Sequence, residues 1–408
     1  MKRTLWVLAL AVLTLLTGCG AEEVQEPTQP PLIEVQVPYE EPAAALRYQD
    51  VELTMRSVWQ REDPQARVLL EAAEFFENQT GAVVTILWPD GNEAEAETDI
   101  LQCSAADFAS LPEGTALDLT EMAEKAGYAE KSHETLRQQI IDQCGYLGAV
   151  AQVPYLGGVY YNTEIFEECG LEEMPATWEE FLSVCQTLRN SGWVPLTLDK
   201  DDTLAATELH LRCALGTAEV ARMMGESGRW DTNLPAIAAM EQVMLFRKEG
   251  NLVTGTPADA PAGQNKMALS NSAMMIGTNA DCWAVEEATL MDLQWGIFPY
   301  PGGMGCGTYM TADVLVIHKD TGNAQAAFDF VMLLATGEFD QLRADVSCGI
   351  PADPANASPI VGAMEAIRTM QPEPLGYLGS KQLDMTVKLW GGWYSKAASY
   401  ASLLELSK

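Results

Sequence analysis

The chain has 408 residues, of which 48% are hydrophobic and 20% are charged, a composition typical of a folded globular protein. Its 24 Lys and Arg face 58 Asp and Glu, so the formal net charge is −34 at pH 7. Such an acidic protein repels the phosphates of nucleic acids and the head groups of anionic lipids. We therefore expect no nucleic-acid partner, and we expect membrane contact only through an attached lipid.

The N-terminus has the layout of a secretory signal peptide. Lys2 and Arg3 precede an apolar run over residues 5–16, which is short for a bilayer span. Leu16-Thr17-Gly18-Cys19 then resembles the bacterial lipobox, in which the cysteine is acylated and becomes the first residue after cleavage. We predict a signal peptide over 1–18 and a lipid such as palmitate on Cys19. An ordinary cleaved signal with a chance cysteine is the alternative.

Residues 19–45 are predicted to be an extended tether. The stretch from 20 to 46 has no Lys or Arg and contains five prolines. A segment of this kind buries too little apolar surface to offset its ordering entropy. We expect an exported lipoprotein, anchored to the outer face of the bacterial cytoplasmic membrane. The remaining residues, about 360, are enough for two lobes rather than one.

The first part of the folded body is predicted to be a β-α-β unit. Residues 51–58 alternate like a strand, and Asp63-Pro64 marks a helix start at which Asp63 would cap the helix. Gly81 ends this helix, and residues 82–87 form the next strand. Such units hold parallel strands, and ligands gather at their carboxyl ends. Trp59 and Gln60 follow the first strand and become candidate binding residues.

The α/β pattern continues along the chain. Thr177 and Glu180 form a capping box at the start of one helix. Residues 154–158 separate two predicted strands, over 149–153 and 159–161. The other expected helices cover 117–126, 134–143, 235–248 and 324–335, and the other expected strands cover 273–276, 295–298 and 312–317.

Neither the cysteines nor the acidic runs indicate a metal site or a cofactor. The eight cysteines beyond Cys19 form no C-x-x-C pair, and both disulfides and buried thiols remain open for them. Asp199-Lys200-Asp201-Asp202 lacks the glycine and the distal glutamate of an EF-hand loop. We expect no metal and no cofactor.

The stretch from Tyr146 to Phe181 carries a resemblance to a known family. It reads YLGAVAQVPYLGGVYYNTEIFEECGLEEMPATWEEF. This is similar to the extracellular solute-binding proteins of ABC sugar importers (family 1), which have V-P-Y, then Y-Y-N-x-x-x-F, G-L and P-x-T-W-x-E-F. Weaker matches in the same order include Lys266-Met267-Ala268 and Trp295-Gly296-Ile297-Phe298-Pro299. The similarity covers roughly residues 50–400.

The resemblance implies a type II periplasmic-binding-protein-like α/β fold. It has two lobes, each a mainly parallel sheet flanked by helices, joined by crossing hinge strands. Lobe 1 would comprise 46–156 with 312–346, and lobe 2 would comprise 157–311 with 347–408. Crossings are expected near 155–159, 309–314 and 347–351. Gly157 and Gly158 would serve as the hinge, although tight packing is an equal explanation for them.

The same resemblance places a ligand between the lobes. Sugars stack on aromatic rings and pair their hydroxyls with carboxylates and amides. The family's usual aromatic residue after A-M-x-I-x-G is displaced here to Trp283, whereas Trp178 and Trp295 are expected in the core. The candidate ligand residues are Trp59, Gln60, Asp107, Tyr155, Asp199, Asn279, Asp281, Trp283, Tyr309 and Trp390.

The implied function is that of a monomeric, non-enzymatic receptor. It would bind a small-molecule solute, a mono- or oligosaccharide, and deliver it to the transmembrane subunits of an ABC permease. The alternatives are a lipid-anchored carbohydrate-active hydrolase and an adhesin. None of the three histidines lies in an H-E-x-x-H motif, and no G-x-S-x-G elbow occurs.

Overall fold

The computed structural model describes residues 46–89, 98–199, 202–225, 233–254, 272–303, 307–370, 372, 374–375, 386–387 and 389–390. All of them belong to the compact unit Tyr39–Lys408. The predicted signal peptide, Cys19 and the tether lie outside the described residues, as do Lys266-Met267-Ala268 and residues 391–393. Within the described part of the chain, no helix is long and apolar enough to cross a membrane.

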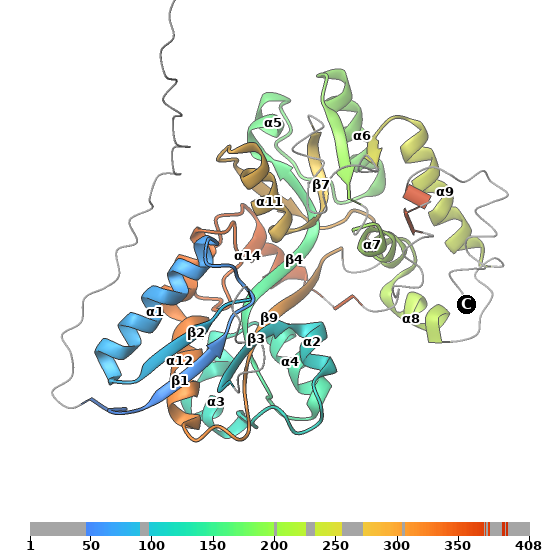
Figure 1. The fold of residues 1–408 in the computed structure, drawn as a ribbon. Coiled ribbons are helices and arrows are strands. Elements are labelled where there is room, and N and C mark those ends of the chain that lie inside the picture. Colours follow the sequence, from blue (N-terminus) through green and yellow to red (C-terminus); the bar gives the residue numbers. More distant parts are fainter. Residues whose placement is uncertain are drawn as a thin grey trace, which may run out of the picture. The chain divides into compact units, whose positions relative to one another are not determined.

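One nine-stranded sheet runs through the molecule in the order β2-β1-β3-β9-β4-β7-β5-β6, with β8 paired to β4 (Figure 1). Strands β1 (Glu52–Arg56), β2 (Val83–Leu87) and β3 (Ile100–Ser104) are parallel to one another. Strand β9 (Tyr309–Ile317) pairs antiparallel with β3. We call the part built on these four strands lobe 1.

The other end of the sheet also has a parallel core. Strand β5 (Val194–Leu198) lies between β6 (Leu252–Thr254) and β7 (Ser272–Thr278), parallel to both. Strand β8 (Trp295–Phe298) adds antiparallel pairing to β4. We call the part built on β5–β8 lobe 2. The fold is the predicted two-lobed α/β arrangement, although antiparallel strands make the sheet mixed.

Strand β4 (Val150–Asn162) belongs to both lobes, which corrects the prediction of two separate strands. Its first part pairs with β9 from Val150 to Gly157, and its last part pairs with β7 from Gly157 to Tyr161. Pro154 does not break the strand because β7 pairing begins only at Gly157, so Pro154 has a strand partner on one side alone. Figure 1 shows β4 running through the middle of the sheet.

Lobe 1 is covered by helices that bury one apolar face. Helix α1 (Pro64–Thr80) begins at Pro64 and ends at Gly81, whose φ of 84° lies in the left-handed region. The prediction that the Asp63 side chain caps this helix is wrong, because its carboxylate accepts the backbone N–H of Gln60 instead. The other lobe 1 helices are α2 (Ala105–Ser110), α3 (Thr120–Ala126), the 3-10 turn η1 (Tyr128–Lys131), α4 (Glu134–Cys144), α12 (Ala324–Ala335) and α13 (Gly337–Asp345).

Lobe 2 has a core rich in aromatic residues. Helix α6 (Trp178–Asn190) starts with the predicted capping box between Thr177 and Glu180. Trp295 is 3% exposed and lies in the core as expected, whereas Trp178 is partly buried and packs against the core on Phe181 and Phe246. The other lobe 2 helices are α5 (Thr163–Glu168), α7 (Thr203–Leu215), α8 (Thr217–Gly225), α9 (Leu234–Lys248), α11 (Asn279–Thr289) and α14 (Ala363–Met370).

Residues 347–351, where the last crossing was predicted, contact both lobes, because Cys348 Sγ donates to Glu286 Oε2 on α11 at 3.1 Å. The backbone carbonyl of Pro351 contacts Nε2 of His133 at 2.9 Å, and the backbone N–H of Asp353 donates to Asp340 on α13 at 3.0 Å. These contacts hold the segment on lobe 1. Val361 then bridges to β8 of lobe 2. The chain therefore contacts both lobes over residues 348–361.

Candidate functional site

The carboxyl ends of β1 and β3 meet at one edge of lobe 1, where a buried chain of polar side chains fixes the loops. Ser57 Oγ donates to Gln102 Oε1 at 2.8 Å, and Gln102 Nε2 donates to Gln152 Oε1 at 2.8 Å. Val58 N–H also donates to Gln102 Oε1, at 3.0 Å. Sequence reasoning missed both glutamines, although an amide inside an apolar strand is a signal that could have found them.

Trp59 and Gln60 lie at this edge, directly after β1. Trp59 is half-buried, and its backbone N–H donates to Ser57 Oγ at 3.1 Å. Its side chain lines a small cavity together with Gln152 and Arg343. Gln60 is exposed. The hydrogen bonds of Ser57 and Gln102 thus fix the backbone of the loop after β1, while the indole of Trp59 remains partly accessible.

Asp107 has a local structural role in addition to any contact with ligand. Its Oδ2 accepts the hydroxyl of Ser104 at 2.7 Å, and its backbone N–H donates to Ser104 Oγ at 3.1 Å. These bonds cap the first turn of α2, which begins directly after β3. Asp107 is exposed at the same edge as the end of β3.

Tyr155 brings an unpredicted carboxylate into the site. Its hydroxyl donates to Asp313 Oδ2 at 2.8 Å, which joins β4 to β9. Burial raises the pKa of Asp313, the bond from Tyr155 lowers it, and the nearby carboxylate of Asp107 raises it. Asp313 is therefore a partly buried acceptor close to Asp107, and its position within an apolar strand pattern concealed it from sequence reasoning.

At the corresponding edge of lobe 2, Asp199 follows β5 and Asp281 lies in the first turn of α11 after β7. Asp281 Oδ2 accepts the backbone N–H of Thr278 at 2.7 Å and its hydroxyl at 3.2 Å. Burial raises the pKa of Asp281, and the neighbouring carboxylate of Asp199 adds to that effect. The structure thus brings these two predicted residues together.

Asn279 lies beneath the site and ties α11 to the crossing strand. It is 2% exposed. Its Oδ1 accepts the backbone N–H of Leu156 at 2.9 Å, and its Nδ2 donates to the carbonyl of Pro154 at 3.3 Å. Both bonds go to the part of β4 that carries Tyr155. Asn279 therefore positions β4 and has little surface to offer a ligand.

Gly157, where β4 pairs with both β7 and β9, is required by the ring of Tyr309. A Cβ atom on Gly157 would overlap that ring, and Tyr309 is 7% exposed. At Gly158 the nearest side-chain atom would lie 3.1 Å from an added Cβ. Close packing thus explains Gly157, and its proposed hinge role is a separate question.

Trp390 is removed from the candidate ligand residues by its burial. It is 0% exposed in the lobe 2 core, and its Nε1 donates to Thr207 Oγ1 at 2.9 Å. The buried hydroxyl of Thr207 satisfies the indole N–H, so no ligand group is needed as its partner. Trp283 is half-buried on α11.

The two buried histidines, His133 and His210, make structural hydrogen bonds away from the candidate site. His210 contacts Tyr300 Oη at 3.0 Å and the carbonyl of Ala239 at 2.7 Å, and burial lowers its pKa to about 4. Burial also lowers the pKa of His133, which bonds to the Pro351 carbonyl. Among the described residues, no three His, Cys, Asp or Glu side chains are grouped to hold a metal ion. The carboxyl edges of the two lobes therefore offer a ligand hydrogen-bonding groups and an aromatic face.

Comparison with known proteins agrees with this arrangement. A family model described as bacterial extracellular solute-binding protein matches residues 60–338. A search of curated proteins finds no match to the sequence.

Solved structures share the fold at low sequence identity. RafE from Streptococcus pneumoniae in its apo form has a TM-score of 0.67 at 17% identity, covering 90% of this chain and 98% of its own. Maltose-bound MalE3 from T. maritima has a TM-score of 0.62 at 18% identity, covering 87% and 98%. A sugar transporter protein from Bacillus licheniformis in complex with stachyose gives 0.57 at 17% identity, covering 86% and 98%.

Proposed function

The chain belongs to the bacterial extracellular solute-binding proteins, and from that premise we propose that it is the saccharide receptor of an ABC importer. It captures a mono- or oligosaccharide between its lobes and delivers it to the permease. Closure of two lobes around a ligand is a recognised hinge motion of such receptors. The family is one of solute-binding proteins rather than hydrolases, which favours a receptor over an enzyme.

The observation that carries the saccharide proposal is the set of side chains at the two carboxyl edges. Lobe 1 offers the partly exposed ring of Trp59 and the hydrogen-bonded pair of Tyr155 and Asp313. Asp199 and Asp281 stand at the edge of lobe 2. A sugar has apolar faces for the ring and hydroxyl donors for the carboxylates, so it matches both kinds of group.

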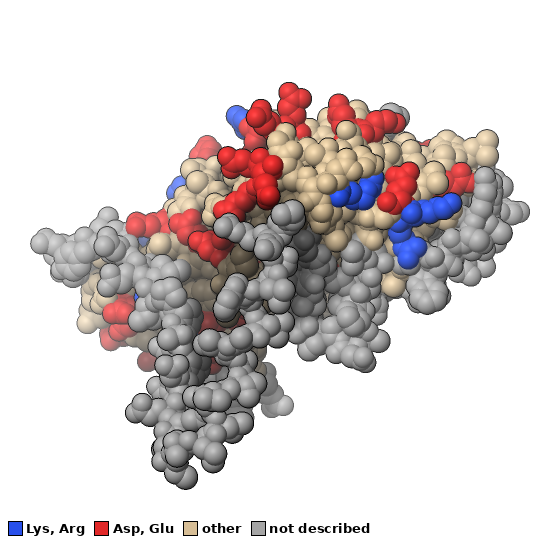
Figure 2. Space-filling view, turned by 90° about the horizontal axis from the view of Figure 1, so that it is seen from above, with Lys and Arg blue, Asp and Glu red and all other residues tan. Residues whose placement is uncertain are grey.

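Two further findings support this choice of ligand class. Solved structures of the same fold were obtained with maltose and with stachyose, although identity to this chain is only 17–18%. The surface is also acidic: Figure 2 shows more Asp and Glu than Lys and Arg on the face in view. An acidic receptor disfavours anionic solutes and leaves neutral sugars unaffected.

We also propose the lipid on Cys19 and the tether over 19–45 as the means of attachment. A soluble receptor dilutes away from its permease, whereas a tethered one stays within reach. A polyproline-like tether of this length spans at most about 80 Å. The permease subunits are then the second partner, and the chain acts as a monomer.

A thermal-shift screen tests the proposal directly. A ligand that binds only the native state at 100 times its Kd adds about 2.7 kcal/mol to the free energy of unfolding. Neutral mono- and oligosaccharides should raise the Tm, whereas amino acids and peptides should leave it unchanged. A Tm raised by amino acids and by no saccharide would reject the ligand class. Release of product from glycosides would instead support the hydrolase.

A further inference from the structure

A small cavity lies behind Trp59 in lobe 1. Its volume is about 10 Å³ in terms of the space open to the centre of a water molecule, which is room for about one water. Part of its lining is apolar and comes from α1, α12 and α13. The polar part of the lining comprises Gln65, Gln152 and Arg343.

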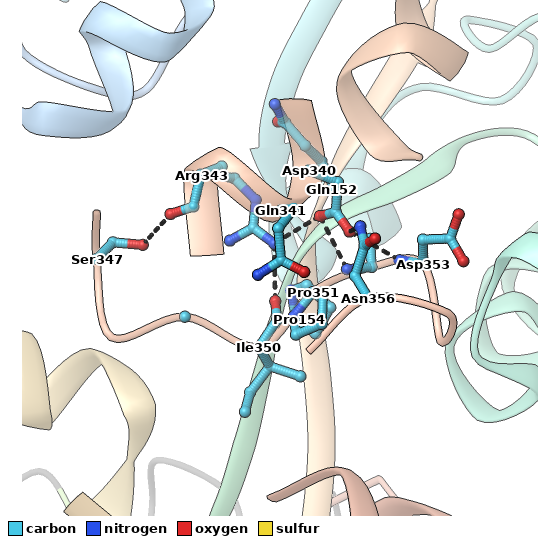
Figure 3. Close-up of polar contacts among 12 residues, drawn as sticks. Gln152, Pro154, Asp340, Gln341, Arg343, Ser347, Ile350, Pro351, Asp353 and Asn356 are labelled. Atoms are coloured by element: carbon cyan, nitrogen blue, oxygen red, sulfur yellow. Dashed lines mark hydrogen bonds and ion pairs between the residues drawn. The ribbon is translucent and has the colours of Figure 1, made fainter. Parts of the chain in front are cut away.

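Arg343 brings hydrogen-bond donors to this cavity. Arg343 is 2% exposed. Its Nη2 donates to Asp340 Oδ1 at 2.8 Å and to the backbone carbonyl of Ile350 at 2.7 Å (Figure 3). Its Nε and Nη1 are also buried, and no described protein atom accepts from either. A buried donor without an acceptor is costly, so an acceptor from outside the chain is expected here.

Size and charge define that acceptor. Asp340 already neutralises the guanidinium, and it also accepts the backbone N–H groups of Ala352 and Asp353. A guest anion would therefore lack a countercharge, and a carboxylate or phosphate is too large for this space. Gln152 Oε1 accepts from Gln102, and neither Nε nor Nη1 of Arg343 is hydrogen-bonded to it. A single uncharged oxygen fits.

We propose that this cavity is a binding site for one structural water molecule, held by the free N–H groups of Arg343. The water stands between Trp59 and Arg343, and Arg343 in turn holds the Ile350 carbonyl of the segment that leads to lobe 2. It thus supports the loop that presents Trp59. Its part in ligand capture rests on the proposed function, whereas its presence does not.

A high-resolution crystal structure of the ligand-free protein tests the site. Ordered density for one oxygen should lie within hydrogen-bond distance of Nε or Nη1 of Arg343. A cavity without such density would overturn the proposal. This result does not depend on any saccharide, so the water site and the receptor function can fail separately.

A substitution that fills the cavity provides a second test, in which the direction of the change in Tm distinguishes a dry cavity from a water site. Val68 lines the cavity from α1, and Val68→Ile adds one methyl group where the water would lie. If the cavity is dry, the additional methyl group fills it and stabilises the protein. If the methyl group displaces a water, the N–H groups of Arg343 lose their acceptor and the protein is destabilised. We expect the Tm to fall by about 3 °C, with the density lost.

The matched control is Val220→Ile, at a 0% exposed position in the lobe 2 core. It separates ordinary overpacking from loss of the water. A Tm raised by Val68→Ile would overturn the site.

Discussion

The hydroxyl of Tyr155 donates a 2.8 Å hydrogen bond to Asp313 on the adjacent antiparallel strand. Tyr155 pairs with Thr311, so Asp313 is its diagonal neighbour two residues along β9. The tyrosine belongs to the family-like V-P-Y motif, whereas the carboxylate was not predicted. Together they give lobe 1 a polar pair at the point where β4 leaves it.

The raised pKa of Asp313 predicts a pH-dependent effect of Asp313→Asn. A carboxyl group with a raised pKa in the folded state stabilises the fold below its unfolded pKa, and that stability is lost as the pH rises through the folded pKa. Asparagine cannot titrate. The difference in Tm between variant and native protein should therefore shift in favour of the variant between about pH 4 and pH 7.

The control for this shift is Glu124→Gln, which changes an exposed carboxylate on α3. The profile of this variant gives the baseline against which the Asp313→Asn profile is compared. A flat profile for Asp313→Asn would show that the environment of Asp313 does not perturb its titration.

Trp59→Ala tests the proposed ligand residue. Loss of a stacked indole should weaken saccharide affinity by about 10- to 100-fold, which corresponds to about 1.4–2.8 kcal/mol. Affinity is measured by calorimetry with the best sugar from the thermal-shift screen. Trp193→Ala, at the opposite end of β5 from Asp199, is the matched control and should leave affinity intact. Equal losses in both would remove Trp59 from the site.

Gly157→Ala should destabilise the protein far more than Gly158→Ala. The new Cβ would overlap the ring of Tyr309, and overpacking of this kind costs about 1–3 kcal/mol or more. At Gly158 the nearest atom is the flexible end of Ile297. Unfolding by urea measures both.

The double variant Gly157→Ala with Tyr309→Ala checks the cause. Without the Tyr309 ring, Gly157→Ala should lower the free energy of unfolding by less, so the effects of the two substitutions should not be additive. Strict additivity would mean that Gly157 is needed for another reason, such as backbone motion.

Asp340→Asn should loosen the segment that leads from lobe 1 to lobe 2. The carboxylate accepts from Arg343, from two backbone N–H groups and from Asn356 Nδ2 (Figure 3). Breaking a buried ion pair from one side costs about 3–5 kcal/mol. Hydrogen exchange should increase at the amides of Ala352 and Asp353. Unchanged exchange there would show that the ion pair does not hold the segment.

Cys19→Ala tests the proposed anchor in cells. The variant should be released from the surface or keep its signal peptide, and its saccharide affinity should be unchanged because Cys19 precedes the folded body. Fractionation and mass measurement of the mature protein report both outcomes. A variant that stays attached would point to another means of retention.

The sequence predicted the regular elements well where local rules determine them. The capping box at Thr177 and the Pro64 to Gly81 helix depend on neighbours in the chain, and both were found at the expected residues. Strand β4 was divided in error because Pro154 is tolerated only where one side lacks a partner strand, which is a tertiary fact. Periodicity alone does not contain that information.

The candidate site was predicted less completely for a related reason. Trp59 and Asp199 follow strands, so the rule for parallel sheets finds them. Asp313 and Arg343 lie inside a strand and a helix, and their role depends on which elements pack beside them. Trp390 was misjudged because its partner Thr207 is distant in sequence.

The sharing of β4 also limits how this protein can be divided. Each lobe draws a central strand from the same 13 residues, so a cut on either side of β4 leaves one lobe with an open sheet edge. Unpaired edges of that kind invite aggregation. The lobes are therefore poor candidates for separate expression, and a split reporter built from this receptor should keep β4 whole and place its break in a surface loop.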